Sequence, residues 1–452
     1  MSESSASFAT CLAAAPVATS QSDPDHGLDS LRMKKLVLAI GVALTAVAAA
    51  VVVFLGGPSN ASPISQDAVV SPNPSDKTPR VQDGAVYKML YTGGVTFVGG
   101  QFTQVKTYTN TGTFNRNRLF AFNASTGGVT GLHATFNSEV WALATDGTNL
   151  WVGGYFNTVN GVKRTGVVKL NPATGAVDTK FNANLNGSVT DMAYVKGRLI
   201  LGGSFSKHLA AVNPATGGDT GYINIAFAGA PNYGDPGPTK VFRFAVNPAG
   251  TRIALVGTFT SVGGQARQRA AMINLGTSSA SVSGWYSSLW NNTCSTAAPS
   301  YTRDVDFSPD GSFFVIVTTG AGFPDEKNRL CDSASRWNTN DQKTTYPIWV
   351  NYTGGDTLLS VQVTRAAVYV QGHQRWLNNP HGDNFPGDGA VDRPGIGALN
   401  PSTGNAYSWN PTKERGVGGY DLLLSPGGLW VGSDTTHIGG EVHERLAFLP
   451  LP

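Results

Sequence analysis

The sequence predicts an all-β protein of the β-propeller class, in which four-stranded blades repeat along the chain. The first observation behind this prediction is a recurring marker of an apolar residue, one or two glycines, a variable residue and a phenylalanine. The marker ends at Phe102, Phe156, Phe205 and Phe259. These phenylalanines lie about 50 residues apart, a period typical of repeat architectures. The marker therefore indicates one structural unit copied several times.

A recurring turn is the second observation. The sequence Asn-Pro-x-Thr-Gly begins at Asn171, Asn213 and Asn400, and a version without proline begins at Asn123. Proline presets φ for the turn and glycine supplies a positive φ. The turn therefore predicts the link between the third and fourth strands of a unit.

Composition is the third observation. The 452 residues include 55 glycines, and only 13% are charged, against about 25% in an average soluble protein. The formal net charge is +3, and no dense basic stripe of the kind that binds nucleic acid is present. We therefore expect an exported β-rich protein without a nucleic-acid partner.

The N-terminal region precedes the repeats. Residues 1–32 predict a disordered extension. Residues 33–61 contain a basic flank and an uncharged apolar run from Leu36 to Leu55, in which roughly 20 residues at about 1.5 Å each would span a bilayer core. This hydrophobic helix is either a signal peptide, with translation starting at Met33, or a single transmembrane anchor, with translation starting at Met1. Both alternatives place the rest of the chain outside the cytoplasm, secreted or anchored to the membrane.

Residues 62–85 are expected to form a linker and closing strand, and residues 86–452 the propeller. Seven blades are predicted, with first strands that begin near Val86, Val140, Val189, Val241, Arg303, Leu358 and Tyr420. The last unit ends just after its third strand, so residues near 78–84 are expected to supply its fourth strand and close the ring. An open solenoid, the alternative, would need a cap at each end.

Together, the two repeated motifs resemble those of the delta-60 repeat family of bacterial β-propellers. The resemblance covers roughly residues 86–450, with the fifth and sixth copies divergent. It implies an exported propeller whose biochemical role is unsettled, and it implies no catalytic residues.

Propeller topology sorts the loops into two faces. The tight turns fall on one face, and the insertions at 103–117, 287–302, 320–345 and 373–394 fall on the other. Cys294 and Cys331 lie in two of these insertions and are predicted to form a disulfide, as paired cysteines of exported domains usually do. Long loops on a rigid scaffold often carry binding residues, so the loop-rich face is the predicted site.

The 373–394 insertion is the richest in chemistry. Its candidate ligand-binding residues are His373, Arg375, Trp376, His381, Asp383 and Arg393. Tryptophan with arginine and carboxylates can hold a sugar, whereas histidine with aspartate can serve acid–base chemistry. A solvated loop packed by one tryptophan is the alternative. The His373–His381 spacing matches no zinc signature, so we predict no metal and no cofactor.

Two further sets of charged residues have both a functional and a structural interpretation. The repeat places cations at Arg118, His208, Arg269 and Arg445. They could line a central channel and attract an anion, or each could tie its strand to a neighbouring loop. Asp304 and Asp306 share a strand face beside Arg303 and could act in acid–base chemistry or in structure.

The leading functional hypothesis is a binding or scaffold module for a cell-surface polysaccharide, wall component or protein. It rests on the expected export, the rigid scaffold and the absence of a recognisable catalytic motif from the sequence. An extracellular polymer-degrading hydrolase or lyase that uses the 373–394 loop is one alternative. A purely structural surface protein is the other.

Overall fold

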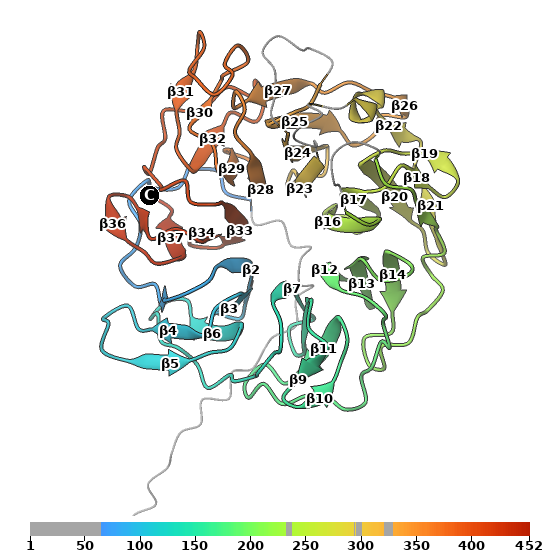
Figure 1. Ribbon diagram of the computed structural model, residues 1–452, viewed down its shortest axis with the longest axis vertical. Coiled ribbons are helices and arrows are strands. Elements are labelled where there is room, and N and C mark those ends of the chain that lie inside the picture. Colours follow the sequence, from blue (N-terminus) through green and yellow to red (C-terminus); the bar gives the residue numbers. More distant parts are fainter. Residues whose placement is uncertain (1–64, 232–236, 293, 295–300, 321–328) are drawn as a thin grey trace, which may run out of the picture. The chain divides into compact units, whose positions relative to one another are not determined.

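The computed structural model describes residues 65–452, except 232–236, 293, 295–300 and 321–328. Within that part the fold is all-β, and η1 (Ser288–Asn291) is a short 3-10 helix (Figure 1). No helix there has the length and apolar character needed to span a membrane. The predicted hydrophobic helix from Leu36 to Leu55 lies outside the described residues.

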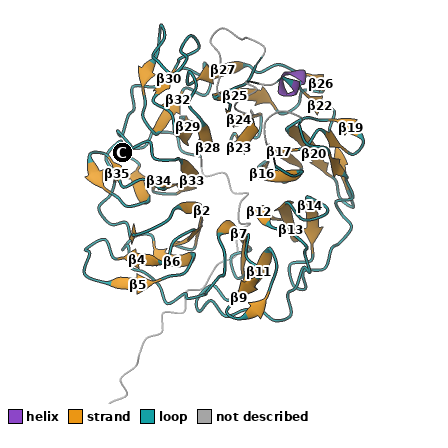
Figure 2. Cartoon of the chain, viewed as in Figure 1, coloured by secondary structure: helices purple, strands orange, loops and turns teal. Residues whose placement is uncertain are grey.

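Seven antiparallel sheets, each beginning with a strand of six or seven residues, form the main part of the described fold (Figure 2). The first four sheets are β2 (Val86–Thr92), β3 (Val95–Gly100), β6 (Leu119–Asn123); β7 (Val140–Thr145), β8 (Leu150–Gly154), β11 (Val167–Leu170); β12 (Val189–Val195), β13 (Arg198–Gly203), β14 (Leu209–Val212); and β16 (Lys240–Val246), β17 (Arg252–Thr258), β20 (Ala270–Leu275), β21 (Ala280–Val282). The other three are β23 (Tyr301–Phe307), β24 (Phe313–Thr319), β25 (Ser333–Asn338), β27 (Trp349–Tyr352); β28 (Leu358–Val363), β29 (Val368–Gly372), β32 (Ile396–Leu399); and β33 (Gly419–Ser425), β34 (Gly428–Ser433), β37 (Leu446–Pro450).

Shorter strands decorate these sheets, mainly between a second and a third strand. They are β1 (Arg80–Val81), β4 (Gln104–Lys106), β5 (Thr113–Asn115), β9 (Thr158–Val159), β10 (Val162–Lys163), β15 (Phe227–Ala228), β18 (Ser261–Val262), β19 (Gln265–Ala266), β22 (Trp285–Tyr286), β26 (Lys343–Thr344), β30 (Trp376–Leu377), β31 (Val391–Asp392), β35 (His437–Ile438) and β36 (Glu441–Val442). In four of the three-stranded sheets, an isolated bridge such as Leu170 to Val177 stands where a fourth strand was expected.

The predicted turn after the third strand is present and has a local cause. The Asn171 side chain accepts hydrogen bonds from the backbone amides of Ala173 and Thr174, at 2.9 and 3.1 Å. Gly175 then adopts a φ of 81°, a conformation that glycine reaches without a Cβ clash. The residues of the motif therefore serve to form the turn, as the sequence indicates.

Neighbouring sheets pack through their first and second strands. Each first strand contacts the first strand of the next sheet, and β33, in the last sheet, contacts β2 in the first. The first glycine of the repeated marker makes room for this packing. A Cβ on Gly99 would lie 2.4 Å from Cγ1 of Val140, and one on Gly432 would lie 2.7 Å from Cγ1 of Val86. The marker glycines therefore set the spacing between sheets.

The 71–78 segment lies along the last sheet. Ser71 and Ser75 donate backbone hydrogen bonds to Pro450 and Phe448 of β37, at 2.7 and 2.8 Å. The sequence predicts that residues 78–84 supply the fourth strand of the last sheet. That prediction is wrong by several residues, because β1 pairs with β4 instead. The residues alongside β37 thus come from a proline-rich stretch expected to be linker.

Candidate binding surface at the first strands

The first strand of every one of the seven sheets contains an irregularity near its start. The pairing register with the second strand shifts by one residue there. The residues skipped by this bulge are Tyr87, Trp141, Thr190, Phe242, Arg303, Leu359 and Tyr420. Bulges re-aim side chains and are frequent beside functional sites.

Four of the skipped residues are aromatic, and with Tyr155 they form what we call the aromatic cluster. Tyr87 stacks on Trp141 with ring centroids 4.2 Å apart, and Tyr420 meets both rings edge-on at 4.9 and 6.5 Å. Phe242 and Tyr155 each lie 6.0 Å from Trp141. Trp141 is therefore the centre of a surface drawn from four sheets.

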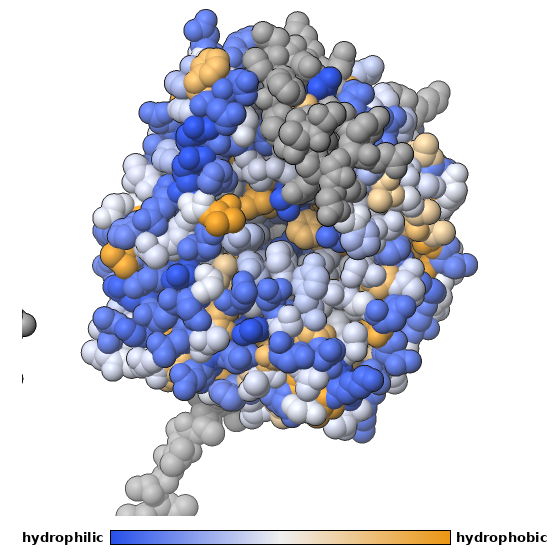
Figure 3. Space-filling view, in the orientation of Figure 1, coloured by the Kyte–Doolittle hydropathy of each residue, from blue (hydrophilic) through white to orange (hydrophobic). Residues whose placement is uncertain are grey.

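The aromatic cluster is only partly covered. Tyr155 is 41% exposed, and Trp141, Phe242 and Tyr420 keep intermediate exposure, while Tyr87 is buried. The face in view in Figure 3 is mostly hydrophilic, with a few hydrophobic residues in orange. Partly exposed aromatic rings bring an apolar face and a polar edge to a surface, which suits a ligand of mixed character.

Polar groups border the aromatic cluster. The Tyr87 hydroxyl donates to Oε1 of Gln101 at 2.9 Å, and the Trp141 indole N–H lies 3.5 Å from Oε2 of Glu139. Burial raises the pKa of Tyr420 to about 12, so its hydroxyl stays protonated at neutral pH. The border therefore offers hydrogen-bond donors and acceptors around the rings.

Beneath the aromatic cluster lies a layer of charge, which we call the polar hub. It is made of residues that directly follow the bulges: Lys88, Asp191, Arg243, Asp304 and Asp421. Sequence reasoning missed this layer except for Asp304. The sequence does contain a pattern that indicates this layer, because the same repeat position is charged in five of the seven predicted first strands.

Arg243 joins several sheets within the polar hub. Its guanidinium donates to the backbone carbonyls of Tyr87 at 3.2 Å and of Trp141 and Thr190 at 3.3 Å. Its central carbon lies 5.8 Å from the centroid of the Trp141 ring, within cation–π range. Arg243 therefore supports the aromatic cluster from below.

The hub carboxylates bind backbone of neighbouring first strands. Asp421 accepts from the amide of Met89 at 2.7 Å and from Nζ of Lys88 at 3.2 Å. Asp191 accepts from the amide of Phe244 at 2.9 Å. Charges that are paired or hydrogen-bonded in this way can be kept away from water. These contacts give the hub a structural role.

Asp304 and Asp306 share one face of β23, as predicted, and both bind the adjacent strand β28. Asp304 accepts from the amide of Val361 at 3.0 Å, and Asp306 accepts from the amide of Val363 at 2.7 Å. Burial raises the pKa of Asp304 to about 6 and that of Asp306 to about 7. The geometry agrees with the structural interpretation of this pair.

In the 373–394 loop, Arg375 and Trp376 lie together. The Arg375 guanidinium is 4.3 Å from the centroid of the Trp376 ring and forms an ion pair with buried Asp356, Nε to Oδ2 at 2.8 Å. Arg415 binds the same carboxylate at 3.0 Å. Arg375 is thus committed to an internal network, whereas Trp376 is half-buried at the loop base.

The other candidates of this loop lie apart. Nδ1 of His373 is 2.6 Å from the carbonyl oxygen of Gly416, and Nε of Arg393 donates to the carbonyl oxygen of Tyr407 at 3.0 Å. His381 and Asp383 are exposed. The six residues predicted to share one site are therefore not brought together around a single point.

The predicted channel cations occupy a different place. Arg118, His208, Arg269 and Arg445 all adopt a positive φ, between 59° and 67°, just before a third strand. Gly166 and Gly395 hold the equivalent position in other sheets, at 76° and 71°. Contacts between sheets run mainly through first strands, so the positions of these four residues favour the structural alternative over a channel.

Two of the cations instead tie their strands to loops. Arg445 donates to the backbone carbonyls of Gly84 at 2.7 Å and Val81 at 2.9 Å. Arg269 donates to the carbonyls of Trp290 and Asn292. For these two residues the hydrogen bonds favour the structural alternative.

The predicted disulfide is present. Cys294 and Cys331 are bonded, with their Cα atoms 5.7 Å apart, and both are buried. The bond joins the two insertions in which the sequence placed the cysteines, so this prediction is confirmed.

One family model supports the propeller class. A family described as "Domain of unknown function (DUF5122) beta-propeller" matches residues 150–181, which include one copy of each repeated motif. No curated protein matches the chain. Three solved structures are distantly similar: the WD40 repeats of RRP9 (11% identity, TM-score 0.48, covering 84% of this chain and 99% of that one), U3-55K (12%, 0.48, 84% and 100%) and the computationally designed Ika8 protein (8%, 0.45, 82% and 98%).

Proposed function

We propose that this chain is an extracytoplasmic β-propeller whose aromatic cluster binds a carbohydrate of the cell surface or wall. One observation carries the proposal: five aromatic side chains from four sheets form a cluster centred on Trp141, and four of the five stay at least partly exposed. Sugar rings present C–H faces that pack on aromatic rings and hydroxyls that need hydrogen bonds. The aromatic cluster supplies rings for the C–H faces, and its border at Gln101 and Glu139 supplies hydrogen-bond partners for the hydroxyls.

The disulfide supports the extracytoplasmic part of the proposal. Disulfides persist mainly in oxidising compartments outside the cytoplasm, and Cys294 and Cys331 are bonded here. The apolar run from Leu36 to Leu55 is the expected means of export. Whether that run is cleaved or kept as an anchor, the aromatic cluster would face the outside of the cell.

We further propose that the seven sheets are seven blades of a closed ring. The contacts between β33 and β2 support closure, as do the hydrogen bonds from the 71–78 segment to β37. Gly432 tests this, because a valine there would overlap Val86 of the first sheet. We expect Gly432→Val to lower the free energy of unfolding by about 1–3 kcal/mol. An unchanged stability would contradict closure.

Retention on insoluble polysaccharides tests the binding proposal. The full chain is passed over a panel of immobilised glycans and wall preparations, and its dissociation constant for the retained glycan is measured. We expect Trp141→Ala to weaken binding about tenfold, because one lost aromatic contact of about 1.4 kcal/mol corresponds to that factor. The thermal midpoint of this variant should be measured alongside, so that unfolding is not mistaken for lost binding.

Two variants make the result specific. Tyr346 is 64% exposed in the connection between β25 and β27, and Tyr346→Ala should bind like the parent. Trp376→Ala tests the 373–394 loop as an extension of the same surface. Equal binding by Trp141→Ala and the parent, or a loss confined to Trp376→Ala, would refute the aromatic cluster as the site.

A further inference from the structure

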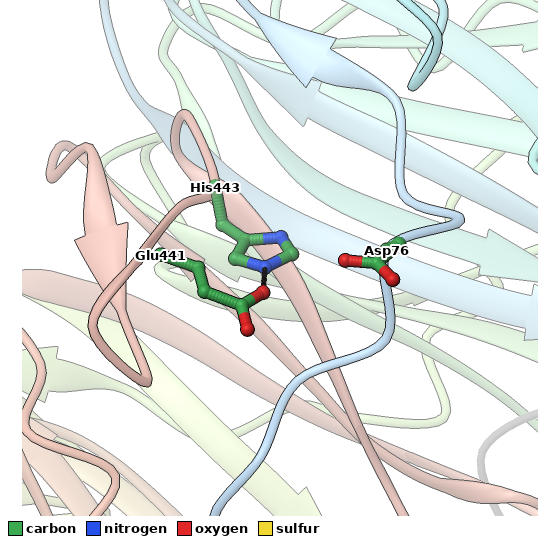
Figure 4. Close-up of side chains that lie close together, drawn as sticks. All are labelled: Asp76, Glu441 and His443. Carbon is green, nitrogen blue, oxygen red and sulfur yellow. Dashed lines mark hydrogen bonds and ion pairs between the residues drawn. The ribbon is translucent and has the colours of Figure 1, made fainter.

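Three metal-ligating side chains converge where the 71–78 segment meets the last sheet. Asp76 belongs to that segment, Glu441 lies in β36, and His443 follows β36 directly. Their ligand atoms, one from each residue, all lie within 4.8 Å of one another. Figure 4 shows the two carboxylates on either side of the imidazole, from parts of the chain that are far apart in sequence.

The imidazole of His443 is held in place from both of its nitrogens. The ring is buried, at 6% exposure, and Nδ1 lies 3.2 Å from Oγ1 of Thr78. Nε2 lies 3.4 Å from Oε2 of Glu441. If Nδ1 donates its hydrogen to the Thr78 hydroxyl, the lone pair of Nε2 faces the Glu441 carboxylate. A lone pair and a carboxylate that face each other favour a positive partner between them, and the Asp76 carboxylate lies close by.

That partner is either a proton on Nε2 or a metal ion, and the donor set decides what kind of ion fits. One imidazole nitrogen with carboxylate oxygens is a ligand set that suits zinc. A hydrogen bond from the other ring nitrogen, here to Thr78, is the outer support that zinc-bound histidines usually have. We propose that Asp76, Glu441 and His443 bind a Zn²⁺ ion, with water completing its coordination.

Small movements of the carboxylates suffice for this geometry. Ligand atoms at about 2.0–2.2 Å from one zinc ion lie at most about 4.4 Å apart, slightly less than the limit of 4.8 Å found here. Asp76 is exposed, and the side chain of Glu441 is 45% exposed. Both can therefore move inward, while buried His443 stays fixed.

The position of the site gives the ion a structural purpose. Asp76 reaches the other two ligands only when the 71–78 segment lies on the last sheet. An ion that binds this arrangement and not the unfolded chain stabilises it by mass action. Zinc would therefore clasp the N-terminal segment to the end of the chain, a role separate from glycan binding.

Titration of the chelator-treated full chain with ZnCl₂ tests the proposal, using calorimetry for binding and thermal unfolding for stability. We expect one zinc per chain and a rise of several degrees in the unfolding midpoint. Asp76→Asn and Glu441→Gln should each weaken binding at least tenfold and abolish the rise. Both replace exposed carboxylates with amides of the same shape, so they should fold.

Two control variants exclude other zinc ligands. Asp67→Asn removes another exposed carboxylate from the same N-terminal stretch, and it should bind zinc like the parent. His437→Gln removes a second histidine–carboxylate pair, which His437 forms with Glu414 at 2.8 Å. The proposal is overturned if Asp76→Asn binds like the parent, if His437→Gln alone loses zinc, or if zinc leaves the midpoint unchanged.

Discussion

Exchanging two residues between adjacent sheets tests how the sheets pack. At several interfaces, a glycine of one second strand faces a valine of the next first strand, as Gly99 faces Val140. Between β29 and β33 the sizes are reversed, with Gln371 in the glycine position and Gly419 in the valine position. A Cβ on Gly419 would lie 1.8 Å from Cγ of Gln371. We predict that Gln371→Gly and Gly419→Val each destabilise the protein and partly compensate each other.

The structure gives the sizes of these effects. Gly419→Val alone forces a branched side chain into filled space, at about 1–3 kcal/mol. Gln371→Gly alone removes a buried amide that donates to Oγ of Ser360 and to the carbonyls of Asp421 and Gly432, at 3.2, 3.2 and 3.3 Å. Lost hydrogen bonds of about 0.5–1.5 kcal/mol each make that variant about 2–4 kcal/mol less stable. In the double variant the valine fills the vacated space, so about 2 kcal/mol of favourable coupling is expected.

Urea unfolding of the parent, both single variants and the double variant measures this coupling. The matched control combines Gln371→Gly with Gly153→Val, which crowds Val189 at a different interface and should give additive losses. Additivity within about 0.5 kcal/mol for the Gln371 and Gly419 pair would refute the reasoning, because it would mean that the two positions do not share one space.

Three further predictions concern Arg243 of the polar hub, the disulfide and the titration of Asp306. Arg243→Met should lower the free energy of unfolding in urea by about 3 kcal/mol or more, because it leaves buried carbonyls and a carboxylate without a partner. Arg365→Met, at a side chain 66% exposed, should lower it by at most about 1 kcal/mol. Equal losses would contradict the structural role of the polar hub. Cys294→Ser opens a loop of 37 residues and should cost up to about 4 kcal/mol, a loss that reduction of the parent should reproduce. Burial raises the pKa of Asp306 from 3.8 to about 7, so the folded state holds a proton that the unfolded chain has lost. The contribution of Asp306 to the free energy of unfolding therefore falls as pH rises from about 4 to 7, and a pH series of Asp306→Asn should lack that part of the fall; identical pH profiles would contradict it.

Local chemistry explains what the sequence predicted well. The turn at Asn171 depends on its own side chain, on Pro172 and on Gly175, all within one short motif. The glycines of the repeated marker follow from close approach of the next sheet, which recurs with the repeat. The disulfide followed from two cysteines placed in neighbouring insertions. Each of these features is fixed by few residues, so a pattern in the sequence is enough to find it.

Register between distant segments explains what was mispredicted. Pro72 and Pro74 lack backbone amides and gave their stretch the character of a linker, yet Ser71 and Ser75 donate to β37. Alternate residues of an extended strand point their amides to opposite sides, so prolines between the two serines are compatible with a strand at a sheet edge. The sequence contains this alternation but not the partner strand.

The bulges explain why the sequence pattern did not point to the aromatic cluster. A strand pattern assumes that successive side chains alternate between faces, and the one-residue shift in each first strand breaks that assumption. The shift places Tyr87 beside Trp141 in the aromatic cluster, while the next residue, Lys88, joins the charged layer below. Because hub carboxylates such as Asp191 bind backbone amides of the next sheet, charge at the centre is explained by packing. Partial exposure of the rings around Trp141 is not needed for packing between the sheets. That exposure favours a ligand at the aromatic cluster over one in the 373–394 loop.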